Sequence, residues 1–545
     1  MPDAIPAADA VPSGGYGTLL MLLIVIAVSV WLGTQAQKAV ERGGFMKGYF
    51  LGNRGLGAWA LALTATVQSG GTFMGFPSLV YTHGWVVALW IASYMVVPIT
   101  GFAVLGKRFA QLSRRTGAIT VPDLFDARFG DQRVGLLASL LIIFFMTFLM
   151  VAQFKAGAIV MKLAWPGNGA LALAEDTSAN GIDQAYYVGL AIFSLTVVGY
   201  TLIGGFLASV WTDLFQSVLM VIGVVMLFFL VVPVASMHGM DRPTLDAVAA
   251  TGPGYAFGPG FPKGDKLFLP LGTAISFFFV WAIGGIGSPA SMVRVMACKD
   301  NRTMRRSIVL LSFYNLLIYL PLVVICICGR ALMPNVPHED EIIPRLAIWS
   351  AREWAGGSFI SGLILAAPFG AVMATVSTYL VVIASGLVRD IYQRFLRPLA
   401  GDNEIRRVSH VVMILFGVIG VVANIRPVGF LQTLIIFSTT STASAFVAPA
   451  LMLAFWRRAT AAGTIAAMVI GASTNVGYSI ARLYLNGPTY DRWSLGLEPI
   501  VWGLAASAIT GVVVSLLTSP PPTELVSSLF DAQPATNPRT ATSTA

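Results

Sequence analysis

Long uncharged apolar runs constrain this chain more than any other feature of its sequence. The stretches Tyr16–Gly33 and Val210–Ala235 each contain at most one ionisable side chain. A helix of about 20 apolar residues is long enough to cross about 30 Å of hydrocarbon. Because runs of this kind recur along the whole chain, the sequence predicts an all-α protein that crosses a membrane many times.

The composition excludes several other classes of protein. Hydrophobic residues make up 56% of the 545 residues and charged residues only 11%, and the mean hydropathy is +0.77. Soluble proteins carry about 25% charged residues, so a soluble enzyme, a nucleic-acid-binding domain and a disordered scaffold are all excluded. The net charge of +9 does not indicate nucleic acid, because Lys and Arg gather in alternate inter-helix loops. Three cysteines are too few for a disulfide framework.

Thirteen apolar spans can be placed on the sequence. The acidic N-terminus lacks the basic region of a cleaved signal, so the first span is expected to be retained. Residues 1–518 are interpreted as one transmembrane transporter domain, and the Pro-, Ser- and Thr-rich residues 519–545 as a disordered cytoplasmic tail. The spans are 16–36, 57–79, 85–107, 134–161, 184–203, 206–236, 271–293, 307–333, 357–388, 407–425, 428–455, 461–482 and 497–518.

Two of these spans are interrupted by Gly and Pro. The second reads TATVQSGGTFMGFP (Thr64–Pro77) and the seventh reads VWAIGGIGSPASMV (Val280–Val293). In lipid, such breaks persist only where the freed backbone groups line a cavity or meet a ligand. Each broken span is the first of five, and the two run in opposite directions, which is typical of an inverted repeat with its binding site at mid-membrane. The repeats would cover about 57–236 and 271–455; close helix packing by small residues is the alternative reading of the glycines.

Few polar residues within the spans could carry chemistry, and acidic residues are almost absent there. Ala371, Ala374 and Thr375 lie on one face of the ninth span, where a hydroxyl and loosened carbonyls could hold a small cation. The alternative is that Thr375 bonds the carbonyl of its own helix. Lys155 could attract an anionic solute, with Gln153 nearby on a different face, or its side chain could extend to the membrane interface.

Several segments resemble the sodium/solute symporter family. They are GGFLASVWTDLFQ (Gly204–Gln216), TVPDLFDARFG (Thr120–Gly130), GSPASMVRVMACKDNRTMRRS (Gly287–Ser307) and FWRRATAAG (Phe455–Gly463). The segment ALTATVQSGGTFMGFP and the seventh span look most similar to pantothenate permeases, followed by monocarboxylate permeases. The resemblance implies a LeuT-like fold of five plus five inverted helices with extra flanking helices.

The same resemblance implies a set of sodium ligands. The carbonyls of Ala65, Gln68 and Ala371 would bind the ion, and a pair of hydroxyls would fall on positions 374 and 375. Thr375 matches this pattern and Ala374 departs from it, so the first hydroxyl is missing. Asp213, after Trp211 and Thr212, would lie on the sodium exit path; the alternative is an acidic residue favoured by the helix dipole.

The sequence is therefore interpreted as a secondary active transporter that imports a small organic solute with sodium by alternating access. A carboxylate such as pantothenate or a monocarboxylate is the favoured solute. Proton-coupled or uncoupled transport, and a transporter-like membrane sensor, are the alternatives. We expect no enzymatic activity, no cofactor besides sodium as the coupling ion, no nucleic-acid partner, contact with membrane lipid, and location in a bacterial inner membrane. The expected solute contacts are Ser69, Thr72, Gln153, Lys155 and Ser288.

The distribution of basic residues predicts the orientation of the chain. With the N-terminus outside and thirteen spans, 23 of the 34 Lys and Arg residues lie in cytoplasmic segments and 10 outside. Reporter fusions at the two ends should therefore report a periplasmic N-terminus and a cytoplasmic C-terminus. Both ends on the same side would contradict the thirteen-span arrangement.

Overall fold

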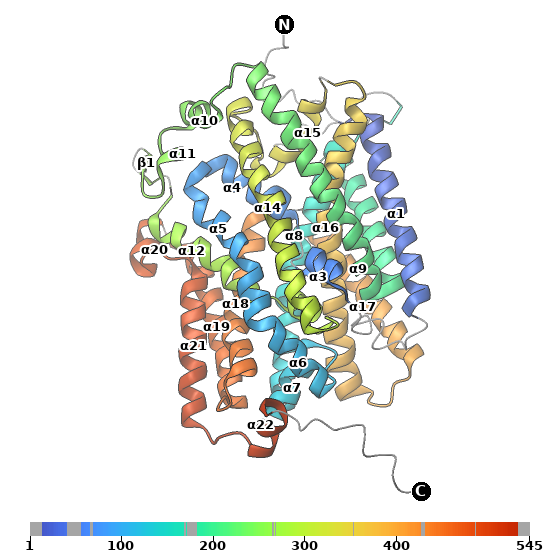
Figure 1. Cartoon of the computed structure of the whole chain (residues 1–545), viewed down its shortest axis with the longest axis vertical. Coiled ribbons are helices and arrows are strands. Elements are labelled where there is room, and N and C mark those ends of the chain that lie inside the picture. Colours follow the sequence, from blue (N-terminus) through green and yellow to red (C-terminus); the bar gives the residue numbers. More distant parts are fainter. Residues whose placement is uncertain are drawn as a thin grey trace.

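Helices form almost all of the structure, a computed structural model that describes residues 14–40, 56–65, 69–167, 170–171, 183–263, 266–267, 269–352, 354–426, 431–485 and 487–531. They stand side by side as a bundle (Figure 1). Within these residues the only strands are a short antiparallel pair, β1 (Pro262–Lys263) and β2 (Lys266–Leu267). The all-α architecture agrees with the sequence-based expectation.

The helical elements follow one another along the described parts of the chain. They are α1 (Tyr16–Val40), α3 (Ala58–Ala65), η3 (Gly71–Gly75), α4 (Phe76–His83), η4 (Gly84–Val87), α5 (Ala88–Val97), η5 (Pro98–Gly106), α6 (Lys107–Thr116), α7 (Val121–Phe129), α8 (Gln132–Ala164), α9 (Gln184–Met237), α10 (Pro243–Thr251), α11 (Gly254–Phe257), α12 (Leu271–Ala282), η6 (Gly284–Gly287), α13 (Pro289–Met296), α14 (Asn301–Leu332), η7 (Glu339–Glu341), α15 (Ile342–Ala351), α16 (Gly357–Ser385), η8 (Gly386–Leu396), α17 (Asp402–Ala423), α18 (Leu431–Phe455), α19 (Ala461–Tyr484), α20 (Gly487–Ser494), α21 (Pro499–Leu517) and α22 (Thr523–Phe530).

Ten helical stretches of the described chain are long and apolar enough to cross a membrane. One of them, α9, has 54 residues and would measure about 80 Å as a single rod, far more than the thickness of a bilayer. Its backbone turns at Gly205, where φ is 56° and ψ is −138°; only glycine adopts this conformation readily. Gly205 therefore divides α9 into the two expected spans 184–203 and 206–236. The total of thirteen spans stays a prediction.

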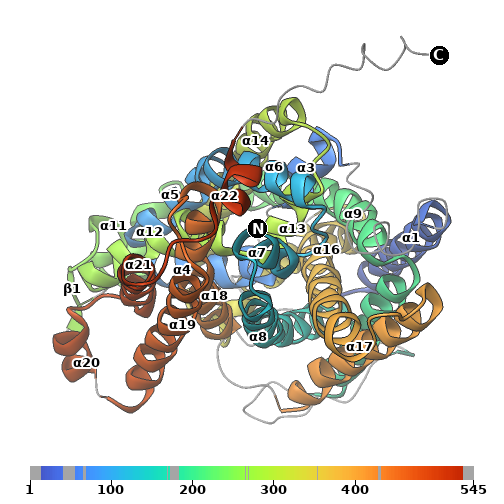
Figure 2. The ribbon, with the colours of Figure 1, turned by 90° about the horizontal axis from the view of Figure 1, so that it is seen from below.

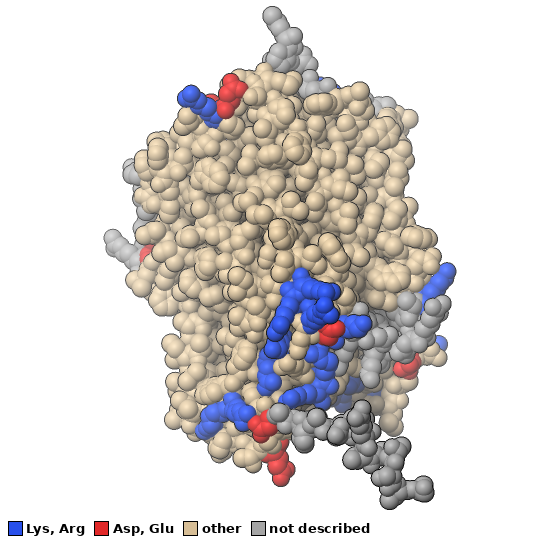
Figure 3. Space-filling view, viewed as in Figure 1, with Lys and Arg blue, Asp and Glu red and all other residues tan. Residues whose placement is uncertain are grey.

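The start of the first described helix and the last described helix lie at opposite ends of the bundle (Figure 1). The amide of Gly14, just before α1, donates to the carbonyl of Leu163 at the end of α8, with an N···O distance of 2.9 Å. Helix α22 packs against α6 and α7. These two helices come just before α8 in the chain, so they lie near the end where α8 begins. On the face shown in Figure 3, Lys and Arg gather in the lower half. At the start of α14, Arg302, Arg305 and Arg306 are exposed. The positive-inside rule favours this end as the cytoplasmic one.

Helix α16 lies at the centre of the molecule, between α1, α8 and α9 (Figure 1). Its residues from Ile364 to Ser385 are all buried. Helices α15 and α17 also pack against it, and the two interrupted segments, α3–α4 and α12–α13, contact it through η3 and α13. A residue on α16 is therefore well placed to contact both interruptions.

The tail differs from the expectation of disorder over residues 519–545. Residues Thr523–Phe530 form α22, and Leu529 is buried. The helix begins after Pro522, its N-cap residue, and Leu525, Leu529 and Phe530 provide apolar contacts that stabilise it. Residues 532–545 lie outside the described part of the chain.

Candidate functional site

The first interruption separates α3 from η3 and α4, and side chains bind the backbone groups that it frees. The amide of Gly70 donates to Oε1 of Gln153 on α8 (2.7 Å), and the amide of Gly71 donates to Oγ of Ser69 (3.0 Å). A Cβ atom at Gly70 would lie 2.9 Å from both Ala156 Cβ and Gln153 Oε1. Glycine is therefore required here by the close approach of α8.

The second interruption lies between α12 and α13, where the short 3-10 helix η6 replaces a regular turn. A Cβ atom at Gly287 would lie 2.9 Å from Cα of Ala443, so α18 packs directly against this backbone. Ser288 then precedes Pro289, the first residue of α13. Proline is favoured at this position because it has no N–H to leave unpaired.

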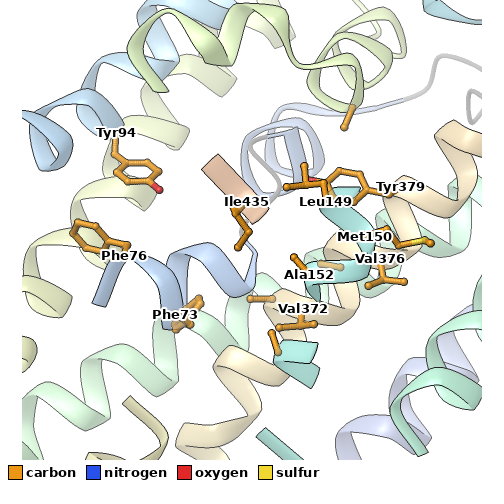
Figure 4. Packing of buried hydrophobic residues seen from close by; sticks show 14 of the residues in the cluster. Phe73, Phe76, Tyr94, Leu149, Met150, Ala152, Val372, Val376, Tyr379 and Ile435 are labelled. Atoms are coloured by element: carbon orange, nitrogen blue, oxygen red, sulfur yellow. The ribbon is translucent and has the colours of Figure 1, made fainter. Parts of the chain in front are cut away.

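A cavity of about 830 Å³, counting the part continuous with solvent, lies between the two interruptions. Ser69, Thr72 and Ser288, three of the predicted solute contacts, line it. Figure 4 shows Tyr94, Leu149, Tyr379 and Ile435, from four different helices, around the segment of the first interruption. The other lining residues are Val97, Met146, Trp281, Gly284, Gly285, Ala290, Ser291, Asn315, Tyr319, Thr439 and Thr442.

Aromatic and neutral polar side chains determine the chemistry of this cavity. The ring centroids of Tyr94 and Tyr319 are 3.9 Å apart with a 19° angle between the planes, and Trp281 stacks on Tyr94 at 5.1 Å. Asn315 donates to the carbonyl of Tyr94 (2.9 Å), which fixes this wall to α14. No Asp, Glu, Lys or Arg is among its lining residues in the described chain. The cavity can therefore offer hydrogen bonds and apolar surface, but no side-chain charge.

The structure places Gln153 and Lys155 away from the cavity lining. Gln153 is buried behind the first interruption, where it accepts the hydrogen bond from Gly70. Lys155 is partly buried, and its charge interacts with Asp340 and Glu341 of η7. Burial raises the pKa of Asp340 to about 6 although Lys155 opposes the shift, and its carboxylate accepts a hydrogen bond from the amide of Leu431 (3.2 Å). Lys155 thus belongs to a charged group at the end of the bundle opposite α22.

The predicted sodium ligands on α16 are buried beside the first interruption. Ala371, Ala374 and Thr375 are all buried, and α16 packs against η3. The Thr375 hydroxyl donates to the carbonyl of Ala371 with an O···O distance of 2.8 Å, which is the bond to its own helix that the sequence left open as the alternative. Ala65 is the last residue of α3, and Gln68 lies outside the described residues.

Asp213 forms a buried ion pair that the sequence analysis did not identify. Its Oδ2 lies 2.5 Å from Nη2 of Arg294 on α13, and the two side chains are 2% and 1% exposed. Arg294 also donates to Thr378 of α16 and to the carbonyl of Thr64 in α3. Arg294 is one of the 23 basic residues that the predicted orientation places in cytoplasmic segments. Its position between Val293 and Val295 in an apolar stretch was the available signal of burial.

A profile of the sodium:solute symporter family matches residues 49–471. The sodium/pantothenate symporter of Escherichia coli (strain K12) is 30% identical over 501 residues, covering 90% of this chain and 94% of the relative. The sodium/pantothenate symporter of Haemophilus influenzae is 29% identical over 464 residues, covering 84% and 89%. The osmoregulated proline transporter OpuE of Bacillus subtilis is 28% identical over 482 residues, covering 87% and 90%.

Solved structures share the fold at lower sequence identity. The substrate-bound, outward-open structure of a Na+-coupled sialic acid symporter has a TM-score of 0.72 and 20% identity, covering 93% of this chain and 99% of that one. MhsT in complex with L-phenylalanine has a TM-score of 0.50 and 13% identity, covering 84% and 97%. The fold is therefore LeuT-like, as the sequence resemblance implied. The chain belongs to the sodium:solute symporter family, and it is a multi-pass membrane transporter that couples the movement of a solute to sodium rather than an enzyme.

Proposed function

We propose that the solute binds in the cavity between the two interruptions and is imported by alternating access. The observation that carries the proposal is the position of this cavity, which lies where both interrupted helices meet and is lined by Ser69, Thr72 and Ser288. Transporters built from inverted repeats bind their solute where broken helices meet near mid-membrane. The cavity then opens to one side of the membrane at a time.

We further propose that the solute is a small carboxylate such as pantothenate or a monocarboxylate. Ala290 and Ser291, in the first turn of α13, line the cavity. The N-terminal end of a helix carries a partial positive charge that attracts anions. Since no basic side chain is among the lining residues of the described chain, the helix end is the group that can receive the carboxylate. The aromatic wall of Tyr94, Tyr319 and Trp281 provides contact area for the rest of the molecule.

Sodium is proposed to bind between the end of α3 and the middle of α16. The carbonyls of Ala65, Gln68 and Ala371, together with the Thr375 hydroxyl, form the donor set. Oxygen atoms are the ligands that small hard cations prefer. Ala374 adds no oxygen from its side chain, so the proposed site is weaker than one with two hydroxyls.

The Asp213–Arg294 pair is proposed to close the sodium exit path. Arg294 connects four helices through Asp213 of α9, Thr64 of α3, Thr378 of α16 and its own position on α13. Sodium moving from α16 toward the α22 end reaches this pair. When α13 moves, the ion pair between Arg294 and Asp213 would break. The Asp213 carboxylate would then be free to attract the sodium ion.

Uptake into proteoliposomes tests the transport proposal directly. An inward sodium gradient should drive accumulation of radiolabelled pantothenate or a short monocarboxylate, whereas an equal potassium gradient should not. Amino acids and sugars serve as comparison solutes. Accumulation that follows a proton gradient and ignores sodium would overturn the ion assignment, and uptake of sugars alone would overturn the carboxylate assignment.

The ligand set predicts opposite effects for two neighbouring substitutions. Thr375→Ala should raise the sodium concentration for half-maximal uptake by about tenfold, because loss of one buried polar partner costs about 1–3 kcal/mol and 1.4 kcal/mol corresponds to tenfold. Ala374→Ser should lower it, since a second hydroxyl completes the donor set. Ser385→Ala, at the last residue of the same helix, is the control. Unchanged sodium dependence in both variants would mean that Thr375 only bonds its own helix.

The buried ion pair predicts a non-additive effect on stability. Arg294→Met or Asp213→Leu alone leaves one charge buried without a partner, which costs about 3–5 kcal/mol, and each should lower the unfolding temperature in detergent. The double variant should recover most of the loss. Arg302→Met, at an exposed arginine, is the matched control. Additive losses in the double variant would show that the two residues act independently.

A further inference from the structure

Four arginines converge at the α22 end of the bundle, and we refer to Arg108, Arg115, Arg128 and Arg457 as the arginine cluster. They belong to three separate elements: α6 carries the first two, α7 the third, and the turn between α18 and α19 the fourth. Positive charges this close together repel one another. Among the described residues, the only carboxylate paired with any of them is Asp531, directly after α22.

Arg128 is the most deeply buried member of the arginine cluster, and its charge needs compensation from neighbouring groups. Its side chain is 1% exposed and donates to the carbonyls of Trp456 (3.0 Å) and Arg457 (3.3 Å). Its Nε and Nη1 atoms have no hydrogen-bond partner. Burial and the charge of Arg108 lower the pKa of Arg128 to about 10. A guanidinium in this position requires compensating negative charge or aromatic surface.

The C-terminal end of α22 supplies that compensation. The carbonyl of Leu529 accepts hydrogen bonds from Arg115 (2.8 Å) and Arg108 (3.3 Å). The Phe530 ring has the guanidinium carbons of Arg108, Arg128 and Arg457 at 4.7, 5.0 and 5.5 Å from its centroid. Helix C-termini carry a partial negative charge, so the end of α22 attracts the whole cluster. Removing α22 would leave the arginines facing one another.

Two elements that α22 contacts, α6 and α7, pack against α13, the half of the second interrupted helix nearer to α22. Helix α6 packs against α13, and Arg114 of α6 donates to the carbonyl of Cys298 just after α13 (3.2 Å). Arg108 also donates through Nε to the carbonyl of Ala454 near the end of α18 (3.0 Å). Seen from below in Figure 2, α22 lies beside α6 and close to α7, with α13 next to them. Helix α22 thus joins α6 and α7, which lie beside α13, to the turn between α18 and α19.

We propose that the arginine cluster is the docking surface for α22, and that α22 acts as a clamp which holds this end of the transporter closed. The proposal rests on the alternating access proposed above. The clamp must detach, or move with one of the elements that it joins, each time the cavity opens toward the α22 end. It therefore sets the balance between the two access states without contacting solute or sodium.

A buried reporter cysteine measures this balance directly. Val295 of α13 is buried and borders a small space between α13 and α6. In full-length protein with Cys298, Cys326 and Cys328 replaced by serine, Val295→Cys is reconstituted in lipid nanodiscs, where both faces are accessible. Reaction with a charged thiosulfonate reagent is followed over time, without solute or sodium. The rate reports how often this end of the protein opens far enough for the reagent to reach α13.

Phe530→Ala should speed this reaction by about tenfold, the factor that corresponds to losing three cation–π contacts of ordinary strength. Truncation after Thr518 should have at least the same effect. Asp531→Asn should change the rate by about twofold or less, because the ion pair with Arg457 is exposed. Phe395→Ala, at an exposed phenylalanine on η8, is the matched control and should leave the rate unchanged.

Equal labelling rates in Phe530→Ala and its parent, with an unchanged unfolding temperature, would overturn the clamp. A lower unfolding temperature with an unchanged labelling rate would also overturn it, because α22 would then only stabilise the fold. If truncation prevents folding, the point variant alone decides. Sodium-driven uptake by the parent protein is measured separately, so failure of the clamp and failure of the transport proposal are distinguishable.

Discussion

Hydrocarbon contains no water to bind a free backbone amide or carbonyl, and this constraint governs the arrangement of the centre of this protein. A helix can be interrupted at that depth only if other protein groups bind what the interruption frees. Here the side chain of Gln153 accepts a hydrogen bond from the amide of Gly70, and Arg294 donates one to the carbonyl of Thr64. Each of these side chains comes from another helix. The interruption that forms the proposed site therefore also fixes which helices must surround it.

The same requirement connects the two halves of the molecule. Arg294 lies on α13, part of the second interrupted helix, yet it binds the backbone at the end of α3 in the first. Its ion pair with Asp213 adds α9, and its hydrogen bond to Thr378 adds α16. A displacement of α13 thus cannot occur without changing the contacts of three other helices. Packed groups with two discrete arrangements are what allow a small local shift to become a change of access.

The features that could be predicted from the sequence are those indicated by residues close together in the chain. Gly and Pro inside apolar runs located both interruptions, and Ser69, Thr72 and Ser288 next to them do line the cavity. The residues that were missed or placed differently depend on partners far away in sequence. Arg294 meets Thr64 across 230 positions, Gln153 faces the backbone of Gly70 rather than the cavity, and the tail becomes helical where it meets α6 and α7. Periodicity and composition contain no information about such contacts.

The described residues that line the cavity include no charged side chain, and this has a consequence for coupling. In a medium of low dielectric constant, opposite charges at short range attract strongly, and a lone charge is costly to bury. The proposed carboxylate at the start of α13 and the proposed sodium ion beside Thr375 would therefore each lower the cost of binding the other. A lysine or arginine in the cavity would weaken this dependence, because it would neutralise the solute without sodium. The position of Lys155 near Asp340 and Glu341, away from the lining residues, fits this requirement. Obligatory coupling can thus arise from the charges of the two cargoes themselves.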